Sequence, residues 1–247
     1  MQERIERAAQ AIRTSRKTIA LTGAGISAES GIPTFRDPGG LWDRYDPEEY
    51  ATIDAFRRDP GKVWQMMRDF TELKTAQPNP GHYALAQLEQ VGLLGCIITQ
   101  NVDNLHQAGG SQDVIEFHGN MRQVVCQRCD TSLPLTEVSL ESLPPYCACG
   151  GVFKPAGVFF GEPIPPHALS RSYQEAHSCE LMLVIGTSAV VYPAAAMPGV
   201  AKEAGARVIE INPEPTDLTD ATADFIIQDK AGLVLPQIVA RIKALAS

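Results

Sequence analysis

The sequence Lys17-Thr-Ile-Ala-Leu-Thr-Gly-Ala-Gly-Ile-Ser-Ala28 indicates how this chain of 247 residues folds. Its first half is short, apolar and rich in β-branched residues, which favours a buried strand. Its second half opens with Gly23 and Gly25, and glycine permits a tight turn and the close approach of a backbone to a phosphate. The segment before it places apolar residues at helical spacing between Ile5 and Ile12. A helix, a strand and a glycine turn in this order predict an α/β nucleotide-binding fold.

Three more apolar runs predict further strands, at 95–99, 181–185 and 207–211. Their weak alternation is typical of strands buried on both faces, as in a parallel sheet. Helical patterns between them, at 83–91 and 194–204, fit an α/β alternation. Ligands of open α/β sheets bind beyond the carboxyl ends of the strands. We therefore expect one cleft to be formed by the residues that follow the strands, Gly23, Gln100, Gly186 and Asn212.

Composition and charge exclude several classes of protein. Hydrophobic residues make up 44% and charged residues 20%, which is ordinary for a globular chain. The net charge of −8 argues against binding to nucleic acid phosphates. No apolar run approaches the roughly 18–20 residues of a membrane span, and residues 1–15 lack the apolar core of a signal peptide. We expect a cytoplasmic protein with no direct nucleic acid or membrane partner.

The cysteines predict a metal site. Four of the six lie close together as Cys126, Cys129, Cys147 and Cys149. In a reducing compartment two close pairs with this separation favour a tetrahedral zinc site, although the second pair has one intervening residue where two are commoner. Four thiolates close the coordination sphere, so we expect one structural zinc per chain. The histidine–glutamate pair of zinc deaminases is missing, which excludes that chemistry.

Two stretches do not fit the predicted sheet and are expected to form a smaller lobe. Residues 33–76 predict a loop and short helices, and residues 119–157 carry the clustered cysteines. We therefore predict a Rossmann-like parallel sheet in a nucleotide-binding domain made of 1–32, 77–118 and 158–247. The smaller lobe then consists of a helical insertion and a zinc-ribbon insertion.

The glycine run supports nucleotide binding but not an ordinary dehydrogenase. Gly23, Gly25 and Ala28 satisfy the dinucleotide pattern, yet a plain strand-to-helix turn explains it equally well. A dehydrogenase also needs an acidic residue at the end of a second strand about 20 residues on, and residues 38–43 form no strand. The run continues to Phe35 and Arg36, which can cover a reactive sugar and pair with phosphate; the alternative is a core phenylalanine and a surface arginine.

Two further segments carry candidate catalytic groups. Asn101 and Asp103 follow the strand at 95–99 and can hydrogen-bond a carboxamide; the alternative is a capped helix start at Asp103 or Asn104. His118 follows another apolar stretch and precedes a glycine. A histidine facing a cleft suits a general base near neutral pH, although a lone histidine is more often structural.

Taken together, these motifs resemble the sirtuin family of NAD-dependent protein lysine deacylases. The matching pieces occur in family order and cover nearly the whole chain. They are the runs 23–42, 99–103, 118–119, 154–162, 186–193 and 211–214, and the four cysteines.

The resemblance implies a reaction and a set of site residues. An acyl-lysine would enter a tunnel between the lobes, and NAD would lie across the α/β domain. Nicotinamide and O-acyl-ADP-ribose would be released, with His118 as general base and Asn101 and Asp103 as its catalytic partners. The implied cofactor-binding residues are Gly23, Ala24, Gly25, Phe35, Arg36, Trp42, Gln100, Asn101, Val102, Asp103, Gly186, Thr187, Ser188, Asn212, Glu214 and Ala231.

The resemblance also implies how the acylated peptide binds. The segment Val158, Phe159, Phe160 and Gly161 would pair with the substrate backbone as an added strand. Relatives that favour succinyl- or malonyl-lysine carry a tyrosine and an arginine where this chain has Met67 and Phe70. An apolar pocket cannot compensate a buried carboxylate, so acetyl or longer apolar acyl groups are expected. Lys154 replaces the usual arginine before Pro155.

Two alternatives remain open at this point. ADP-ribosyl transfer to a protein would use the same NAD site, and sequence hardly separates it from deacylation. A non-enzymatic module that binds nucleic acid through the cysteine cluster is opposed by the net charge.

Overall fold

Six parallel strands form the central sheet of the structure, a computed structural model that describes residues 1–35, 39–69 and 75–246. The strand order is β3-β2-β1-β7-β8-β9. If these six strands are numbered 1 to 6 along the chain, the order reads 3-2-1-4-5-6, which is that of a doubly wound dinucleotide fold. The topological switch point then lies between β1 and β7. The strands are β1 (Thr18–Thr22), β2 (Cys96–Thr99), β3 (Val114–Glu116), β7 (Leu181–Ile185), β8 (Arg207–Asn212) and β9 (Phe225–Gln228).

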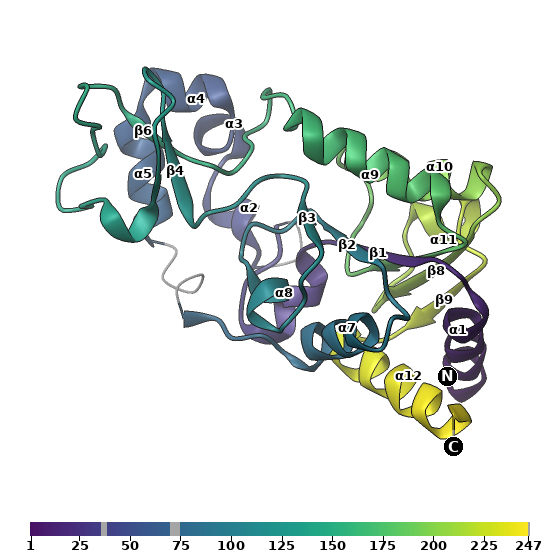
Figure 1. Ribbon diagram of the computed structural model, residues 1–247. Coiled ribbons are helices and arrows are strands. Elements are labelled where there is room, and N and C mark those ends of the chain that lie inside the picture. Colours follow the sequence, from purple (N-terminus) through teal and green to yellow (C-terminus); the bar gives the residue numbers. More distant parts are fainter. Residues whose placement is uncertain (36–38, 70–74, 247) are drawn as a thin grey trace.

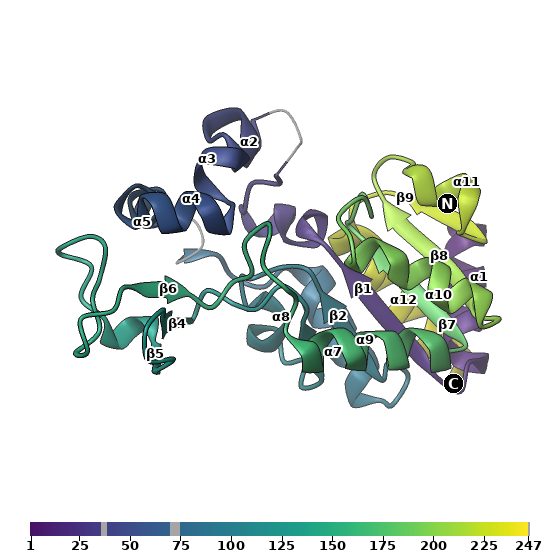
Figure 2. The same cartoon turned by 90° about the horizontal axis from the view of Figure 1, so that it is seen from above.

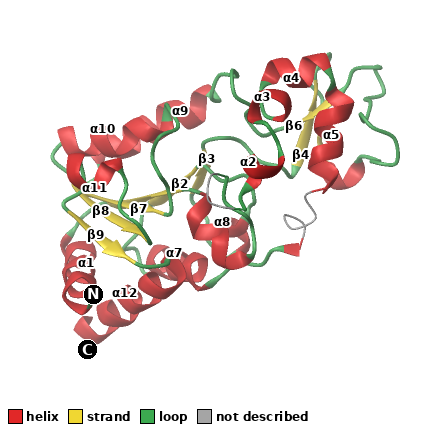
Figure 3. Ribbon diagram, turned by 180° about the vertical axis from the view of Figure 1, so that it is seen from behind, coloured by secondary structure: helices red, strands yellow, loops and turns green. Residues whose placement is uncertain are grey.

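Helices cover both faces of this sheet (Figures 1 and 3). One layer consists of α1 (Gln2–Thr14), α7 (Pro80–Gln90) and α12 (Ala231–Ala246). The other consists of α9 (Pro166–Ser178), α10 (Met197–Glu203) and α11 (Asp217–Ala221). Both chain termini lie in the first layer, at the start of α1 and at the end of α12 (Figure 1).

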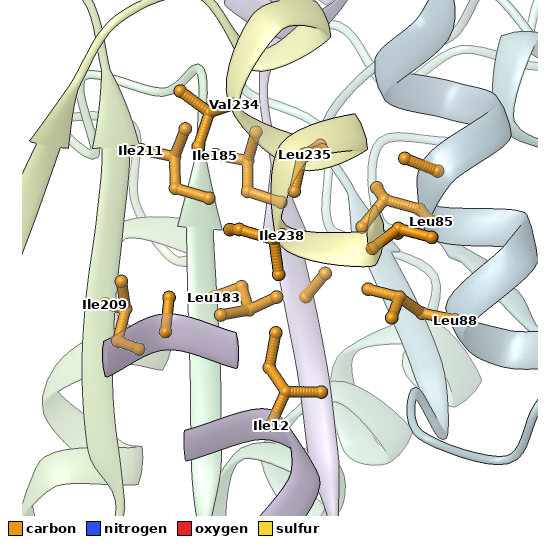
Figure 4. Close-up of a cluster of buried hydrophobic side chains, with 14 of the residues drawn as sticks. Ile12, Leu85, Leu88, Leu183, Ile185, Ile209, Ile211, Val234, Leu235 and Ile238 are labelled. Atoms are coloured by element: carbon orange, nitrogen blue, oxygen red, sulfur yellow. The ribbon is translucent and has the colours of Figure 1, made fainter. Parts of the chain in front are cut away.

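Side chains of β7 alternate between two apolar cores, one on each face. Leu183 and Ile185 point to the layer of α1, α7 and α12, where they pack with Ile12 and Ile238 (Figure 4). Met182 and Val184 point to the layer of α9 and α10. All five residues of β1 and of β7 are buried. Burial on both faces explains why the sequence showed continuous apolar runs instead of alternation.

The two insertions pack together as a smaller lobe beside the sheet (Figure 2). The first supplies α2 (Leu41–Arg44), α3 (Pro47–Tyr50), α4 (Ile53–Arg58) and α5 (Pro60–Asp69), and the second supplies an antiparallel sheet of β4 (Gln123–Cys126), β5 (Ser132–Pro134) and β6 (Phe153–Pro155). Trp64 of α5 is buried and donates from Nε1 to the carbonyl oxygen of Phe153 at 2.7 Å. One apolar core therefore joins the two insertions, and the expected fold class is confirmed.

The structure contains several elements that the sequence did not predict. Helices α9 and α12 and strand β9 were not predicted, and the glycine turn leads into a 3-10 helix, η1 (Ala24–Ser30). A short helix, α8 (Leu105–Ala108), follows β2. Among the described residues no helix is both long enough and apolar enough to cross a membrane.

Candidate active site

The loops that follow β1 and β7 touch at the topological switch point. The backbone N–H of Gly25 donates to the carbonyl oxygen of Gly186 at 2.8 Å. A Cβ on Gly25 would lie 2.8 Å from the Cα of Gly186, and Gly186 adopts a φ of +59°. Only glycine fits a backbone this close in that conformation. The glycines of the dinucleotide pattern thus serve, first of all, to bring these two loops together.

Polar groups from the ends of four strands lie close together beside these loops: side chains after β2 and β7 and at the end of β8, and the backbone of Gly23 after β1. Gln100 donates from Nε2 to the Thr187 hydroxyl at 2.9 Å. Asn212 donates from Nδ2 to the carbonyl oxygen of Thr187 at 3.0 Å and to the buried carboxylate of Glu210 at 2.9 Å. Gly23 is the fourth member, and its N–H donates to the carbonyl oxygen of Ile185. The carboxyl edge of the sheet therefore carries a continuous polar network.

The remaining residues expected to bind the adenosine half lie around this edge. Ser188 and Glu214 are exposed in the loops after β7 and β8. Ala231 is buried at the start of α12, and the N–H of its neighbour Gly232 donates to Glu29 of η1 at 2.7 Å. These residues belong to the same end of the sheet as the glycine loops.

Asn101 and Asp103 are joined through a serine that sequence reasoning missed. The Ser27 hydroxyl donates to Asp103 Oδ2 at 2.7 Å and accepts from Asn101 Nδ2 at 3.2 Å. Asn101 Nδ2 also donates to the carbonyl oxygen of Gly23 at 3.1 Å. Asp103 Oδ1 accepts from the N–H of Leu105, so this carboxylate also stabilises the start of α8. Burial raises the pKa of Asp103.

Two buried histidines lie next to this network and contact Ser27 and Thr22. His82 lies 3.5 Å from the Ser27 hydroxyl through Nε2, and its ring packs against that of His106. His106 Nε2 lies 2.9 Å from the Thr22 hydroxyl, which donates to Thr99. Burial lowers the pKa of His82 to about 4 and that of His106 to about 3, so both rings are neutral at physiological pH. Nothing in the local sequence pattern ties these residues to the site, because the contacts join segments far apart in the chain.

His118 follows β3, the neighbour of β2 in the sheet, and contacts the residue that comes directly after β2. Its Nδ1 lies 3.1 Å from the carbonyl oxygen of Gln100. A carbonyl only accepts, so the neutral ring carries its proton on Nδ1 and presents Nε2 as an acceptor. Burial lowers the pKa of His118 and outweighs the bond to Gln100, which raises it. The ring packs edge-on against Phe117. His118 has the tautomer and the protonation state of a general base.

Three aromatic rings in succession connect Phe35 with the segment at 158–161. Phe35 and Trp42 lie with ring centroids 5.3 Å apart, and Trp42 lies 6.5 Å from Phe160. Phe35 is 39% exposed, so it is available to cover a ligand. Arg36 and Phe70, which the sequence analysis also assigned to the site, lie outside the described residues. Met67 is half-buried against the core of the small lobe.

The segment expected to pair with a peptide is already paired on one side. The N–H of Phe160 donates to the carbonyl oxygen of Ala51, and the N–H of Ile53 donates to the carbonyl oxygen of Phe160, both at 2.9 Å. The N–H of Val158 donates to the carbonyl oxygen of His118 at 2.9 Å. This segment therefore runs from His118 to the helical insertion. Among the described residues, the carbonyl of Val158 and the backbone groups of Gly161 have no backbone partner, whereas the N–H and the carbonyl of Phe159 are bonded to Glu162.

The four clustered cysteines meet the geometric test for zinc. All four Sγ atoms lie within 4.8 Å of one another. The Cys126–Cys149 and Cys129–Cys147 sulfurs are 3.5 and 3.8 Å apart. A tetrahedron with Zn–S bonds of about 2.3 Å has edges of about 3.8 Å, so the sulfurs are spaced as ligands. They join the turn after β4 to the turn that precedes β6.

Comparisons with known proteins agree with this site. The Sir2 family model matches residues 23–193. A protein of Pyrobaculum aerophilum named NAD-dependent protein deacylase 2 is 50% identical over 237 residues, which cover 95% of this chain and 94% of that protein. A solved Sir2 homologue mutant–ADP ribose complex is 45% identical, with a TM-score of 0.93 over 98% of each chain. A solved Sir2–p53 peptide–NAD+ complex is 33% identical, with a TM-score of 0.89 over 98% of this chain and 99% of that one.

Proposed function

Because this chain belongs to the Sir2 family and is an NAD-dependent protein lysine deacylase, we propose roles in that reaction for the residues described above. The resemblance stated from sequence is thereby confirmed at the level of family and activity. The observation that carries the catalytic assignment is the anchoring of His118 Nδ1 on Gln100, because Nε2, which has no partner among the described residues, is then the nitrogen that can take a proton.

The residues present fit NAD at the carboxyl edge of the sheet. When bound, NAD supplies the ribose carbon that accepts the acyl oxygen, and nicotinamide and O-acyl-ADP-ribose are released. Both Nδ2 hydrogens of Asn101 are occupied by Gly23 and Ser27. Among the described residues its Oδ1 has no donor, so Asn101 accepts from the N–H groups of a carboxamide. Asp103 keeps Ser27 oriented for this, and the Val102 backbone assists.

The remaining cofactor-binding residues, in the glycine loops and beyond them, hold the rest of the dinucleotide. In this proposal the turn at 23–25 binds phosphate, with Arg36 as a further phosphate ligand, and Phe35 and Trp42 shield the reacting sugar from water. The adenosine half is bound by the residues beyond β7 and β8, with Ala231 beside them: Gly186, Thr187, Ser188, Asn212 and Glu214. Asn212 Nδ2 is fully used by Thr187 and Glu210, which leaves Oδ1 to accept from a hydroxyl.

His118 acts on a ribose hydroxyl. Its Nε2 accepts the hydroxyl proton, and the Gln100 carbonyl stabilises the charge that then develops on the ring. Positioning contributes more to such a reaction than nucleophile strength. When the reacting groups are held in the correct geometry, the step becomes effectively unimolecular. The neutral state of His118 at neutral pH suits this role.

We propose an acyl-lysine peptide substrate that lies along Val158, Phe159, Phe160 and Gly161. The acyl chain would enter toward Met67 and Phe70, which offer no charge to a substrate carboxylate. The test is a pair of otherwise identical peptides that carry acetyl-lysine or succinyl-lysine. A kcat/KM at least about tenfold higher for the acetyl peptide is expected, which corresponds to about 1.4 kcal/mol. A higher value for the succinyl peptide would overturn the proposed acyl preference.

The same proposal covers the organisation and the location of the protein. The cysteine cluster holds one structural zinc, whose binding stabilises the small lobe. We propose that the NAD-binding domain consists of residues 1–32, 77–118 and 158–247. The small lobe consists of residues 33–76 and 119–157. A cytoplasmic location is proposed because a thiolate site of this kind persists in a reducing compartment.

A further inference from the structure

Lys154 is a buried lysine whose ammonium hydrogens are all used within the protein. It lies in β6, and its side chain is only 8% exposed. Nζ donates to the carbonyl oxygens of Pro155 and Gly157 at 2.9 and 2.7 Å, and it lies 3.0 Å from a carboxylate oxygen of Glu162. An ammonium group carries three N–H donors, so the set of partners is complete. A buried cation of this kind is tolerated only where it is paired and hydrogen-bonded.

The partners of Lys154 span one short segment from end to end. The carbonyl groups stand at 155 and 157, and the carboxylate stands at 162. Between them, Nζ lies 4.4 Å from the centroid of the Phe159 ring. The same Glu162 oxygen accepts from the N–H of Phe159 at 2.8 Å. One side chain therefore fixes the course of residues 155–162.

This segment connects three parts of the molecule. Its Val158 N–H donates to the carbonyl oxygen of His118, and its Phe160 pairs with residues 51–53 of the helical insertion. At its start, Lys154 itself pairs with Val125 in β4, one residue before the metal ligand Cys126. Lys154 thus stands between the metal-binding ribbon and the stretch of backbone that is proposed to receive the peptide.

We propose that Lys154, together with Glu162, is a positioning residue for the acyl-peptide: it holds the peptide-pairing segment 158–161 in place beside His118. This inference rests on the proposed function of that segment. No contact of Lys154 with the substrate is required, because it acts through the backbone that it anchors.

Loss of the ammonium group should affect peptide binding much more than the other functions. Without Lys154 two carbonyl oxygens lose their side-chain donor and the Glu162 carboxylate keeps only the N–H of Phe159, and buried groups left unpaired drive a loop to rearrange. The His118 ring is held separately by Gln100, and the glycine loops are held by the contact between Gly25 and Gly186. Peptide KM should therefore rise while kcat and the KM for NAD change little.

The test compares Lys154→Met, Lys154→Arg and Glu162→Gln with the unaltered protein, using an acetyl-lysine peptide and NAD. Lys202→Met is the matched control, because Lys202 pairs with Asp224 at the exposed surface of the large domain. Nicotinamide release gives the kinetic constants, and elemental analysis and thermal unfolding report zinc content and folding. For Lys154→Met, peptide KM should rise at least about tenfold, or about 1.4 kcal/mol. Lys154→Arg keeps the cation and its donors and should recover most of this loss.

The outcomes separate this inference from the proposed function. If the unaltered protein releases no nicotinamide with the peptide, the proposed function fails whatever Lys154 does. If it is active and a folded, zinc-loaded Lys154→Met variant keeps its peptide KM, the positioning role is wrong. An equal rise in the KM for NAD would also overturn it, because that pattern indicates general damage. Should Lys154→Met fail to fold, Glu162→Gln decides: it removes only the charge, and a selective rise in peptide KM is still expected.

Discussion

His118 Nδ1 lies 3.1 Å from the carbonyl oxygen of Gln100, the residue that directly follows β2. This relationship fixes both the orientation and the tautomer of the ring, because a carbonyl oxygen accepts only from a protonated nitrogen. The same Gln100 reaches Thr187 beyond β7 with its side chain. His118 and the loops proposed to bind NAD are therefore both in contact with one residue, Gln100.

Replacing His118 with alanine should lower turnover by about 10²–10⁴-fold, the usual contribution of a general base. Binding of NAD should persist, since the glycine loops are held by their own contacts. Nicotinamide release with an acetyl-lysine peptide measures turnover, and titration calorimetry measures NAD binding. Near-normal turnover in the variant would show that another group takes the proton.

The pH dependence of kcat/KM should reflect the buried position of His118. A base must be deprotonated to act, so activity is lost as the pH falls through its pKa. Burial lowers the pKa of His118 from the ordinary value of 6.5, and the acid limb should therefore lie below pH 6.5. The measurement is kcat/KM from pH 4.5 to 8 with a peptide that has no histidine. An acid limb above pH 6.5 would contradict the described environment of His118.

Removal of zinc should unfold the small lobe and leave the sheet intact. Trp64 reports on this lobe, since its ring is buried there and bonded to Phe153 beside Cys126. In a Trp42→Phe background Trp64 is the only tryptophan. A strong chelator should then shift the tryptophan emission to longer wavelength, while most of the helical circular dichroism remains. Elemental analysis should find about one zinc per chain before the chelator is added. Protein that contains no zinc at that stage and still shows the tryptophan emission of a folded small lobe would exclude the site.

The buried pair His82 and His106 should make the protein less stable in acid. Their pKa values of about 4 and about 3 lie below the value of about 6.5 in an unfolded chain. Between these limits the unfolded state binds more protons, so the free energy of unfolding falls as the pH drops from about 6.5 toward 4. Denaturant titrations of the protein and of His106→Gln across this range provide the test. Because carboxyl groups titrate in the same window, the expected result is a shallower pH dependence in the variant; equal slopes would contradict it.

The sequence analysis was most successful where one strand or motif carries its own signal. The strands β1 and β7 are buried on both faces, so their apolar runs stand out without any tertiary information. The cysteine pairs and the residues after β2 and β7 were likewise identified from local spacing. The Sir2 family match confirms the reading that these motifs gave together.

The elements that escaped prediction have weaker local patterns. Helix α9 buries only Ala168, Ser172 and Ala176, which are too small or polar to give an apolar stripe. Helix α12 contains a glycine near its start and Pro236 in its interior, both of which argue locally against a helix. Tertiary packing overrides these preferences, because the rest of α12 covers the first apolar core.

The supporting groups of the site were missed for a different reason. Ser27 and His82 are 55 residues apart, and only the packing of η1 against the start of α7 brings them together. Lys154 stood out from the sequence only as a replacement of arginine. Its buried position and its ion pair with Glu162 depend on the conformation of the loop between them, which local residue patterns do not predict. Such relationships follow from the fold and not from residue spacing.

The most direct test of the central claim follows one acetyl-lysine peptide, with and without NAD, by mass spectrometry and by nicotinamide release. The acetyl group should be lost only when NAD is present, with one nicotinamide formed for each acetyl group removed. Acetyl loss at the same rate without NAD would contradict the account. So would stable transfer of label from NAD to protein without deacetylation, which would identify the site as an ADP-ribosyl transferase.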